Sequence, residues 1–344
     1  MRAFTRPFAL SPHVRRMACI AALLGMAACG RDKPGLAGQI KADGSSTVFP
    51  LTTAVTDDFL KVNPDVRISV AISGTGGGFE HFCRGETDIQ NASRPIDARE
   101  RSACDSGGVT FLEVPVAYDA LTIIVHPRNS WATSMTLDEL RKLWEPKAEG
   151  TVMRWADVRA GWPDEPIRLF GPGPASGTFD YFTEAVMATA RASRTDYSAS
   201  EDDTVIVKGV AADVHALGYV GYGYFHQSGT LLKSVPIDTQ RGTVALSAVS
   251  PSADTVRRGL YQPLSRTLFI YVNASSAERP EVLAFVNFYL KEAEELIGRV
   301  GGIGLSSRTY ELVRQRVARR AAGTLFADRS LLARNLELVL SQAQ

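Results

Sequence analysis

The feature that most constrains this chain is a junction that recurs three times: a strand-like segment, a loop of glycine, serine and threonine, and a helix-compatible run. The clearest loop is Ser176-Gly177-Thr178, which opens onto the apolar run 179–190. Two further loops of this kind occupy residues 44–50 and 73–78. Regular alternation of short strands with helices is typical of α/β proteins. The sequence therefore predicts an α/β fold.

These junctions are suited to binding an anion. The first turn of a helix has unpaired backbone N–H groups and lies at the positive end of the helix dipole. Serine and threonine hydroxyls add donors, and Gly177 lets an oxyanion approach the backbone closely. The turn 91–95 contributes Ser93 and Arg94. Together the three loops and this turn predict one small anion held by several neutral donors. Ser176 taken alone could instead be an ordinary helix N-cap.

The N-terminus predicts export. Residues 1–28 carry four arginines and no acidic residue, and they end in an apolar run of about a dozen residues, too short to span a bilayer and suited to a signal peptide. The run ends in LGMAACG, which resembles a bacterial lipoprotein cleavage box, with Met26 in place of the usual leucine. We expect 1–28 to be a lipoprotein signal peptide and Cys29 to carry the lipid. Plain secretion, with Cys29 incidental, is the alternative.

The charge balance argues against a nucleic-acid partner. Without residues 1–28 the chain has 34 basic and 37 acidic residues, a net charge of −3. Nucleic-acid binding needs a basic surface, so this class of function is disfavoured. A slightly acidic protein that binds an anion must use local dipoles instead of a global field.

Two cysteines remain for pairing, Cys83 and Cys104, because Cys19 lies in the signal segment and Cys29 is the expected lipid site. An even pair in an oxidising compartment predicts a disulfide, which would steady the turn that contains Ser93 and Arg94. The loop-entropy estimate gives a stabilisation of about 3 kcal/mol. The alternative is two separate buried thiols.

The chain is long enough for more than one domain, and 45% of its residues are apolar, enough for a full core. Strands are expected at 66–72, 109–114, 121–125, 167–170, 218–221 and 267–272. Helices are expected at 51–61, 136–144, 179–190, 281–290 and 306–320.

Two segments, 114–127 and 261–273, have the character of crossings between lobes. They predict a first lobe of 38–118 plus 270–320 and a second lobe of 123–265, with the anion in the cleft between them. The alternative is two consecutive independent domains. Residues 321–344 are expected to form an amphipathic tail, as one helix.

The motifs together resemble those of a known family. The stretches DGSSTVFP (43–50), SGTGGG (73–78), DIQNASRP (88–95), SGT (176–178) and GYVGY (218–222) are similar, in collinear order, to the periplasmic phosphate-binding proteins of phosphate-specific ABC transporters. The resemblance spans roughly residues 40–308. It implies a two-lobed type II periplasmic binding protein, in which each lobe is a mixed sheet flanked by helices. It also implies a periplasmic or envelope protein that delivers inorganic phosphate to a membrane permease.

The resemblance also implies the phosphate-binding residues. From the first lobe they would be Ser46, Thr47, Thr75, Gly76 and Ser93. From the second lobe they would be Ser176, Gly177 and Thr178.

The sequence departs from the family at two positions of this site. Pro172 stands where well-known members have an arginine, and Ser93 stands where they have an aspartate acceptor. Arg94 is the natural replacement for the guanidinium, because its planar fork matches a phosphate edge. A structural salt bridge is the alternative role for Arg94.

A buried carboxylate that accepts the proton of phosphate would reject sulfate, which lacks that proton. Asp119, in the first crossing segment, is the first candidate for this acceptor. Asp43 and Asp180, which flank the binding loops, are the alternatives.

Other functions are weighed against this interpretation. The ligand could be another tetrahedral oxyanion such as sulfate, molybdate or tungstate, and an adhesion lipoprotein could use the same fold. An envelope phosphatase would need a metal cluster or an activated nucleophile. The five histidines are isolated in the sequence, and Ser176 lacks the Gly-x-Ser-x-Gly pattern. We therefore expect a monomeric binding protein without catalysis, cofactor or metal.

Overall fold

The structure of the chain is a computed structural model. The structure describes residues 35–174, 176–200, 202–238, 248–328, 331 and 335–343. The expected signal peptide and Cys29 lie outside these residues. All the elements described below belong to one compact unit, Ala37–Gln344.

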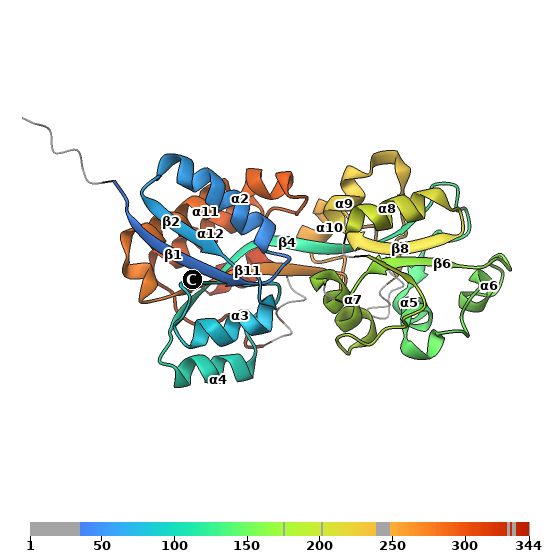
Figure 1. The fold of residues 1–344 in the computed structure, drawn as a ribbon, viewed down its shortest axis with the longest axis horizontal. Coiled ribbons are helices and arrows are strands. Elements are labelled where there is room, and N and C mark those ends of the chain that lie inside the picture. Colours follow the sequence, from blue (N-terminus) through green and yellow to red (C-terminus); the bar gives the residue numbers. More distant parts are fainter. Residues whose placement is uncertain are drawn as a thin grey trace, which may run out of the picture. The chain divides into compact units, whose positions relative to one another are not determined.

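Three parallel strands form one end of the main sheet. They are β1 (Gly38–Gly44), β2 (Val66–Val70) and β3 (Ile89–Ala92), with β1 in the middle. Parallel strands need crossover connections, which are provided here by the helices α2 (Phe49–Val62) and α3 (Gly74–Cys83). The helices α2 and α11 (Pro280–Arg299) lie on one face, and α3 and α4 (Ala98–Ser106) lie on the other (Figure 1).

Two long antiparallel strands run through the middle of the sheet, β4 (Phe111–Val125) and β11 (Ser265–Asn273). β11 also pairs with β3. β4 pairs with β11 up to Ala120, and from Leu121 onward it pairs with β8 instead. The two strands therefore connect the first group of strands to the second.

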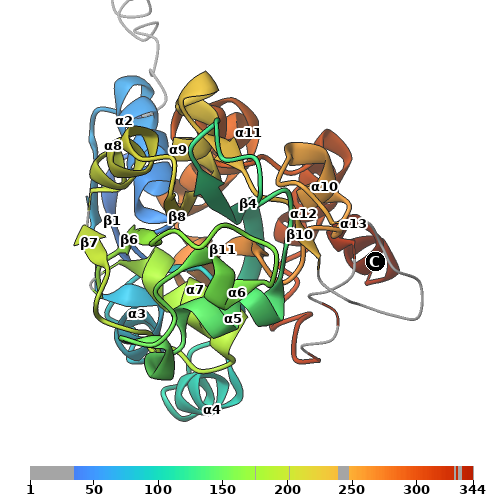
Figure 2. The ribbon, with the colours of Figure 1, turned by 90° about the vertical axis from the view of Figure 1, so that its right-hand side faces the viewer.

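The second group consists of β8 (Ala216–Gly221), β6 (Arg168–Pro172), β7 (Ser198–Ser200) and the short β9 (Lys233–Ser234). Figure 2 shows α8 (Asp203–Ala212) and α9 (Tyr222–Gln227) on one side of these strands and α5 (Leu137–Trp144) and α7 (Gly177–Met187) on the other. Aromatic packing holds α5 and α7 against the sheet. Phe182 stacks on Tyr219 with ring centroids 3.8 Å apart, and Trp144 meets Tyr219 edge-on at 5.0 Å.

Short elements complete the fold. They are α6 (Trp155–Val158), α10 (Ala253–Arg257), α12 (Ser307–Ala318), α13 (Leu336–Gln342), the strand pair β5 (Met135–Thr136) and β10 (Ile237–Asp238), and the 3-10 turns η1 (Pro146–Ala148), η2 (Gly229–Leu231) and η3 (Ser276–Glu278).

The predicted disulfide is confirmed. Cys83, at the end of α3, is bonded to Cys104 in α4, with the Cα atoms 4.1 Å apart. The bridge spans 21 residues and closes a loop that contains β3 and the Ser93–Arg94 turn. It therefore joins the two helices on one face of the first group of strands.

Two expectations about secondary structure are wrong. The expected strands 109–114 and 121–125 are parts of the single strand β4. Pro115 lies inside it without ending it, because the pairing with β11 shifts register opposite Leu268 and Phe269.

The expected single helix over 321–344 does not form either. Gly323 has a φ of +81° and makes a parallel bridge with Leu112, and the helix α13 begins only at Leu336, after the cap residue Asn335. Buried Glu113 accepts hydrogen bonds from Thr324 Oγ1 and from the Leu325 N–H, which holds this part of the tail against β4.

Candidate functional site

The loop after β1 brings hydroxyl groups to the start of α2. Ser46 and Thr47 are half-buried, and the Thr47 N–H donates to Ser45 Oγ at 3.2 Å. Val48 precedes α2 and offers no side-chain cap to the described helix. The Phe49 N–H donates to the Ser45 carbonyl at 3.0 Å, and Pro50 has no N–H. In the first turn of this helix the Leu51 N–H, which has no partner among the described residues, is therefore the group available to another acceptor.

The loop after β2 and the turn after β3 are joined by a small hydrogen-bond network. Thr75 Oγ1 lies 3.1 Å from Ser93 Oγ and accepts the Ser93 N–H at 3.2 Å. Gln90 Nε2 donates to the Thr75 carbonyl at 2.9 Å. This network fixes two of the predicted binding loops side by side.

The third loop begins α7. Ser176 Oγ accepts the Thr178 N–H at 3.1 Å, so the capping role that the sequence left open for Ser176 is present. A hydroxyl that accepts this bond still has its own hydrogen to donate. Capping and anion binding are thus compatible at Ser176.

Loops from the two groups of strands meet at Gly177. A Cβ placed on Gly177 would lie 2.9 Å from Ser46 Oγ and 3.0 Å from Thr47 Oγ1. Real Cβ atoms essentially never lie closer than 3.0 Å to such a neighbour, so a side chain here would require the Ser46 hydroxyl to shift. Glycine is therefore what allows the two loops to touch.

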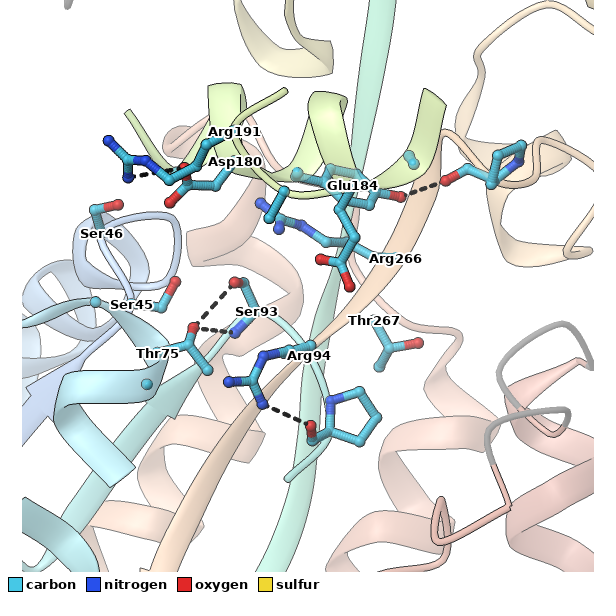
Figure 3. Close-up of a pocket in the computed structure, with 18 of the residues that line it drawn as sticks. Ser45, Ser46, Thr75, Ser93, Arg94, Asp180, Glu184, Arg191, Arg266 and Thr267 are labelled. Atoms are coloured by element: carbon cyan, nitrogen blue, oxygen red, sulfur yellow. Dashed lines mark hydrogen bonds and ion pairs between the residues drawn. The ribbon is translucent and has the colours of Figure 1, made fainter. Parts of the chain in front are cut away.

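Two cavities lie on either side of this contact, and both are lined by Ser46 and Gly177. The larger, of about 740 Å³, is shown in Figure 3. Of the predicted site residues it is also lined by Thr75, Gly76, Ser93 and Arg94. The other, of about 500 Å³, is also lined by Thr47, Asp119, Ser176 and Thr178. All the predicted residues thus border one of two cavities that share a wall.

Arg94 forms the salt bridge that the sequence left open as the alternative. Its Nη1 and Nη2 donate to the two carboxylate oxygens of Glu100 at 2.8 and 2.7 Å, and Nη1 also donates to the Pro95 carbonyl at 3.2 Å. The Glu100 carboxylate raises the pKa of Arg94. In Figure 3 the guanidinium turns away from α7 and toward Pro95. Both terminal nitrogens of Arg94 are therefore committed to a structural contact.

A second arginine, Arg266 of β11, lines the larger cavity and was missed by the sequence interpretation. Its Nε and Nη2 lie 3.1 and 3.0 Å from Asp119 Oδ2, and Nη2 donates to Thr47 Oγ1 at 3.0 Å. The two side chains are 13% and 17% exposed. Asp119 and Arg266 occupy paired positions on β4 and β11. Only this strand register brings them together.

The two alternative carboxylates have other partners. Asp43 is buried, with Oδ1 accepting the Gly44 N–H at 2.7 Å and Oδ2 lying 2.8 Å from His81 Nδ1. Asp180 lines the larger cavity and pairs with Arg191 at 3.2 Å. For Asp119 Oδ1, in contrast, no hydrogen bond is formed among the described residues.

Other features of the described chain bear on the classes of function considered above. Within it, no group of three or more His, Cys, Asp or Glu side chains has metal-binding geometry. None of its helices has the length and apolar character needed to cross a membrane. At Pro172, where family members carry an arginine, the carbonyl accepts a hydrogen bond from Tyr197 Oη at 2.8 Å.

Comparison with known proteins identifies the family. The family model of the PBP superfamily domain matches residues 31–293. Phosphate-binding protein PstS of Staphylococcus saprophyticus is 34% identical over 298 residues, covering 85% of this chain and 89% of its own length. The chain belongs to the PBP superfamily, in the family of the phosphate-binding PstS proteins.

Two further relatives agree with this assignment. Protein SphX of a Synechocystis species is 45% identical over 324 residues, covering 93% of this chain and 94% of its own length. A possible phosphate binding protein from Planctomyces limnophilus, known from its crystal structure, is 42% identical in sequence to this chain. The two structures match with a TM-score of 0.73 over 83% of this chain and 100% of the other. The two-lobed fold expected from the sequence is thereby confirmed, with β4 and β11 as the two crossings. The family is one of substrate-binding proteins for transport.

Proposed function

We propose that the chain binds inorganic phosphate in the cleft between its lobes and delivers it to a membrane ABC permease. The observation that carries this proposal is the contact at Gly177, where a second-lobe loop lies against Ser46 and Thr47 of the first lobe. One anion at this contact would receive hydrogen bonds from both lobes. Bound phosphate would then favour the closed arrangement over the open one.

The proposed donors are neutral groups that line the two cavities. They are the hydroxyls of Ser46, Thr47, Thr75, Ser93, Ser176 and Thr178, with the backbone N–H groups of Gly76 and Gly177. Neutral donors suit a protein whose mature net charge is slightly negative.

Asp119 is the proposed acceptor for the phosphate proton. Its Oδ1 is not engaged by the described residues, whereas both oxygens of Asp43 are engaged. Sulfate brings no proton to this carboxylate, so two anionic oxygens would face each other, which disfavours sulfate.

We further propose that the mature chain is a monomeric envelope lipoprotein, anchored through Cys29, without enzymatic activity. The lobes would comprise 38–118 plus 270–320 and 123–265. The point at which β4 changes partner, between Ala120 and Leu121, supports these limits.

Calorimetric titration of the purified mature protein with phosphate, sulfate and molybdate tests this function. We expect saturable binding of one phosphate per chain and no comparable binding of the other two anions. Preferential binding of sulfate or molybdate would show that this anion, and not phosphate, is the ligand. The absence of binding for all three anions would overturn the proposal.

A further inference from the structure

We propose that Arg266 is the cationic residue of the anion site, and that Arg94, which lines the same cavity, is a structural residue. This inference rests on the proposed function and names the group that supplies positive charge to the bound oxyanion. It assigns the role that the sequence suggested for Arg94 to a residue of the second crossing strand.

The location of Arg266 supports this role. β11 runs between the lobes, and Arg266 lines the same cavity as Ser46 and Thr75 of the first lobe and Gly177 of the second. In Figure 3 its guanidinium extends from β11 into the space between Ser93 and the helix that carries Asp180. An anion that contacts both lobes would therefore lie beside this side chain.

The guanidinium is held in place on three sides. Asp119 Oδ2 accepts from Nε and lies 3.0 Å from Nη2 as an ion pair, and Thr47 Oγ1 accepts from Nη2. The centroid of the Tyr181 ring lies 3.9 Å from the guanidinium carbon. Burial of an arginine is costly unless a partner offsets it, and Asp119 is that partner for Arg266. The cation–π contact with Tyr181 also restricts the orientation of the planar guanidinium.

One side of the guanidinium remains available for a ligand. Nη1 has no hydrogen-bond partner among the described residues, so its two N–H groups can donate to an anion. Thr47 Oγ1 accepts from Arg266, which leaves its own hydroxyl hydrogen to donate as well. Arg266 and Thr47 thus form a preorganised pair of donors for a tetrahedral oxyanion.

Arg94 makes a bidentate contact with a carboxylate of its own lobe. Both of its terminal nitrogens donate to Glu100, and Glu100 Oε2 also accepts the Asp97 N–H at 2.8 Å in the capping box of α4. Arg94 therefore stabilises the turn between β3 and α4. Its Nε–H and the second hydrogen of Nη2 have no partner among the described residues, so the experiment below compares the two arginines directly.

The two arginines form a matched pair for a test. Calorimetry with inorganic phosphate compares the wild type with Arg266→Gln, Arg266→Lys and Arg94→Gln. We expect Arg266→Gln to weaken phosphate binding at least about tenfold, as for the loss of a hydrogen bond to a charged ligand. Arg266→Lys keeps the charge but not the fork, so it should lie between Arg266→Gln and the wild type. Arg94→Gln should bind phosphate within about threefold of the wild type and should unfold at a lower temperature, because it loses the contact to Glu100.

The outcomes separate this inference from the proposed function. If the wild type binds phosphate and Arg266→Gln binds it equally well, or if only Arg94→Gln loses binding, the role of Arg266 is overturned and the proposed function stands. If the wild type does not bind phosphate, the proposed function itself fails. Circular dichroism of the empty variants verifies that Arg266→Gln is folded, and graded affinities with lysine between glutamine and arginine would support a direct contact.

Discussion

The helices that reach the site from the two lobes begin in different ways. In the first lobe, the residues before α2 and α3, Val48 and Ser73, provide no side-chain cap within the described structure. In the second lobe, Ser176 caps α7 through the Thr178 N–H. An uncapped first turn keeps its N–H groups for an external acceptor, whereas a capped turn has already used one of them. In α2 the Phe49 N–H donates to the Ser45 carbonyl and Pro50 has no N–H, so this helix offers the Leu51 N–H, whereas the start of α3 has no such bond among the described residues. In the second lobe one hydroxyl, that of Ser176, serves both helix capping and the proposed ligand binding.

A large effect on both affinity and lobe closure is expected where the two lobes touch through glycines. A Cβ on Gly223 of α9 would lie 2.2 Å from the carbonyl oxygen of Gly301, which follows α11. Backbone atoms cannot move aside as a flexible side chain can. We expect Gly223→Ala to hinder lobe closure and to weaken phosphate binding about ten- to a hundredfold, the range that overpacking costs.

Gly221→Ala is the control for this variant. Gly221 lies two residues earlier with a φ of −62°, and a Cβ there would meet no described atom within 4 Å. Its affinity should stay within about twofold of the wild type, because the added methyl group causes no overpacking at this half-buried position. Small-angle scattering with saturating phosphate should show that Gly223→Ala is less compact than Gly221→Ala. Equal affinity and equal compactness of the two variants would show that binding does not need this contact.

The contrast between capped and uncapped helices is sharpened by three alanine variants. Ser46→Ala, Thr178→Ala and Ser176→Ala should each weaken phosphate binding by about 1.5–3 kcal/mol, or ten- to a hundredfold. Only Ser176→Ala should also lower the stability of the empty protein, by about 1 kcal/mol, because only Ser176 caps a helix. Calorimetry and thermal unfolding measure the two effects. If Ser176→Ala loses stability and keeps its affinity, the second-lobe loop is a helix cap and no more.

A smaller effect concerns selectivity. Asp119→Asn removes the proposed proton acceptor and can donate a hydrogen bond to sulfate. We expect the ratio of phosphate to sulfate affinity to fall about tenfold, the size of one hydrogen bond to a charged group. Competition calorimetry with the two anions provides the ratio. An unchanged ratio would remove Asp119 from the role of acceptor.

The local parts of the site could be predicted from the sequence, because glycine, serine and threonine between a strand and a helix are short-range signals. The disulfide followed from the export signal and the two remaining cysteines. The continuity of β4 could not be predicted, because Pro115 is accommodated by a register shift in the pairing of β4 with β11, which is distant in the chain.

The role of Arg266 could not be predicted for a similar reason. Arg266 and Asp119 are separated by 147 positions and meet only through the pairing of β4 with β11. The sequence indicated Arg94 because this residue is adjacent to Ser93. No local pattern indicated that Arg94 would form a salt bridge with Glu100. Residues made neighbours by a sheet register are the part of a site that a single sequence does not reveal.

We expect both lobes to bind one phosphate at once. A crystal structure of the mature chain with phosphate tests this expectation most directly. We predict one anion with oxygens about 2.7–3.2 Å from Ser46 Oγ, the Gly177 N–H and Arg266 Nη1. The salt bridge between Arg94 and Glu100 should remain intact in that structure. Phosphate bound to one lobe alone, or at a site away from Gly177, would contradict the account.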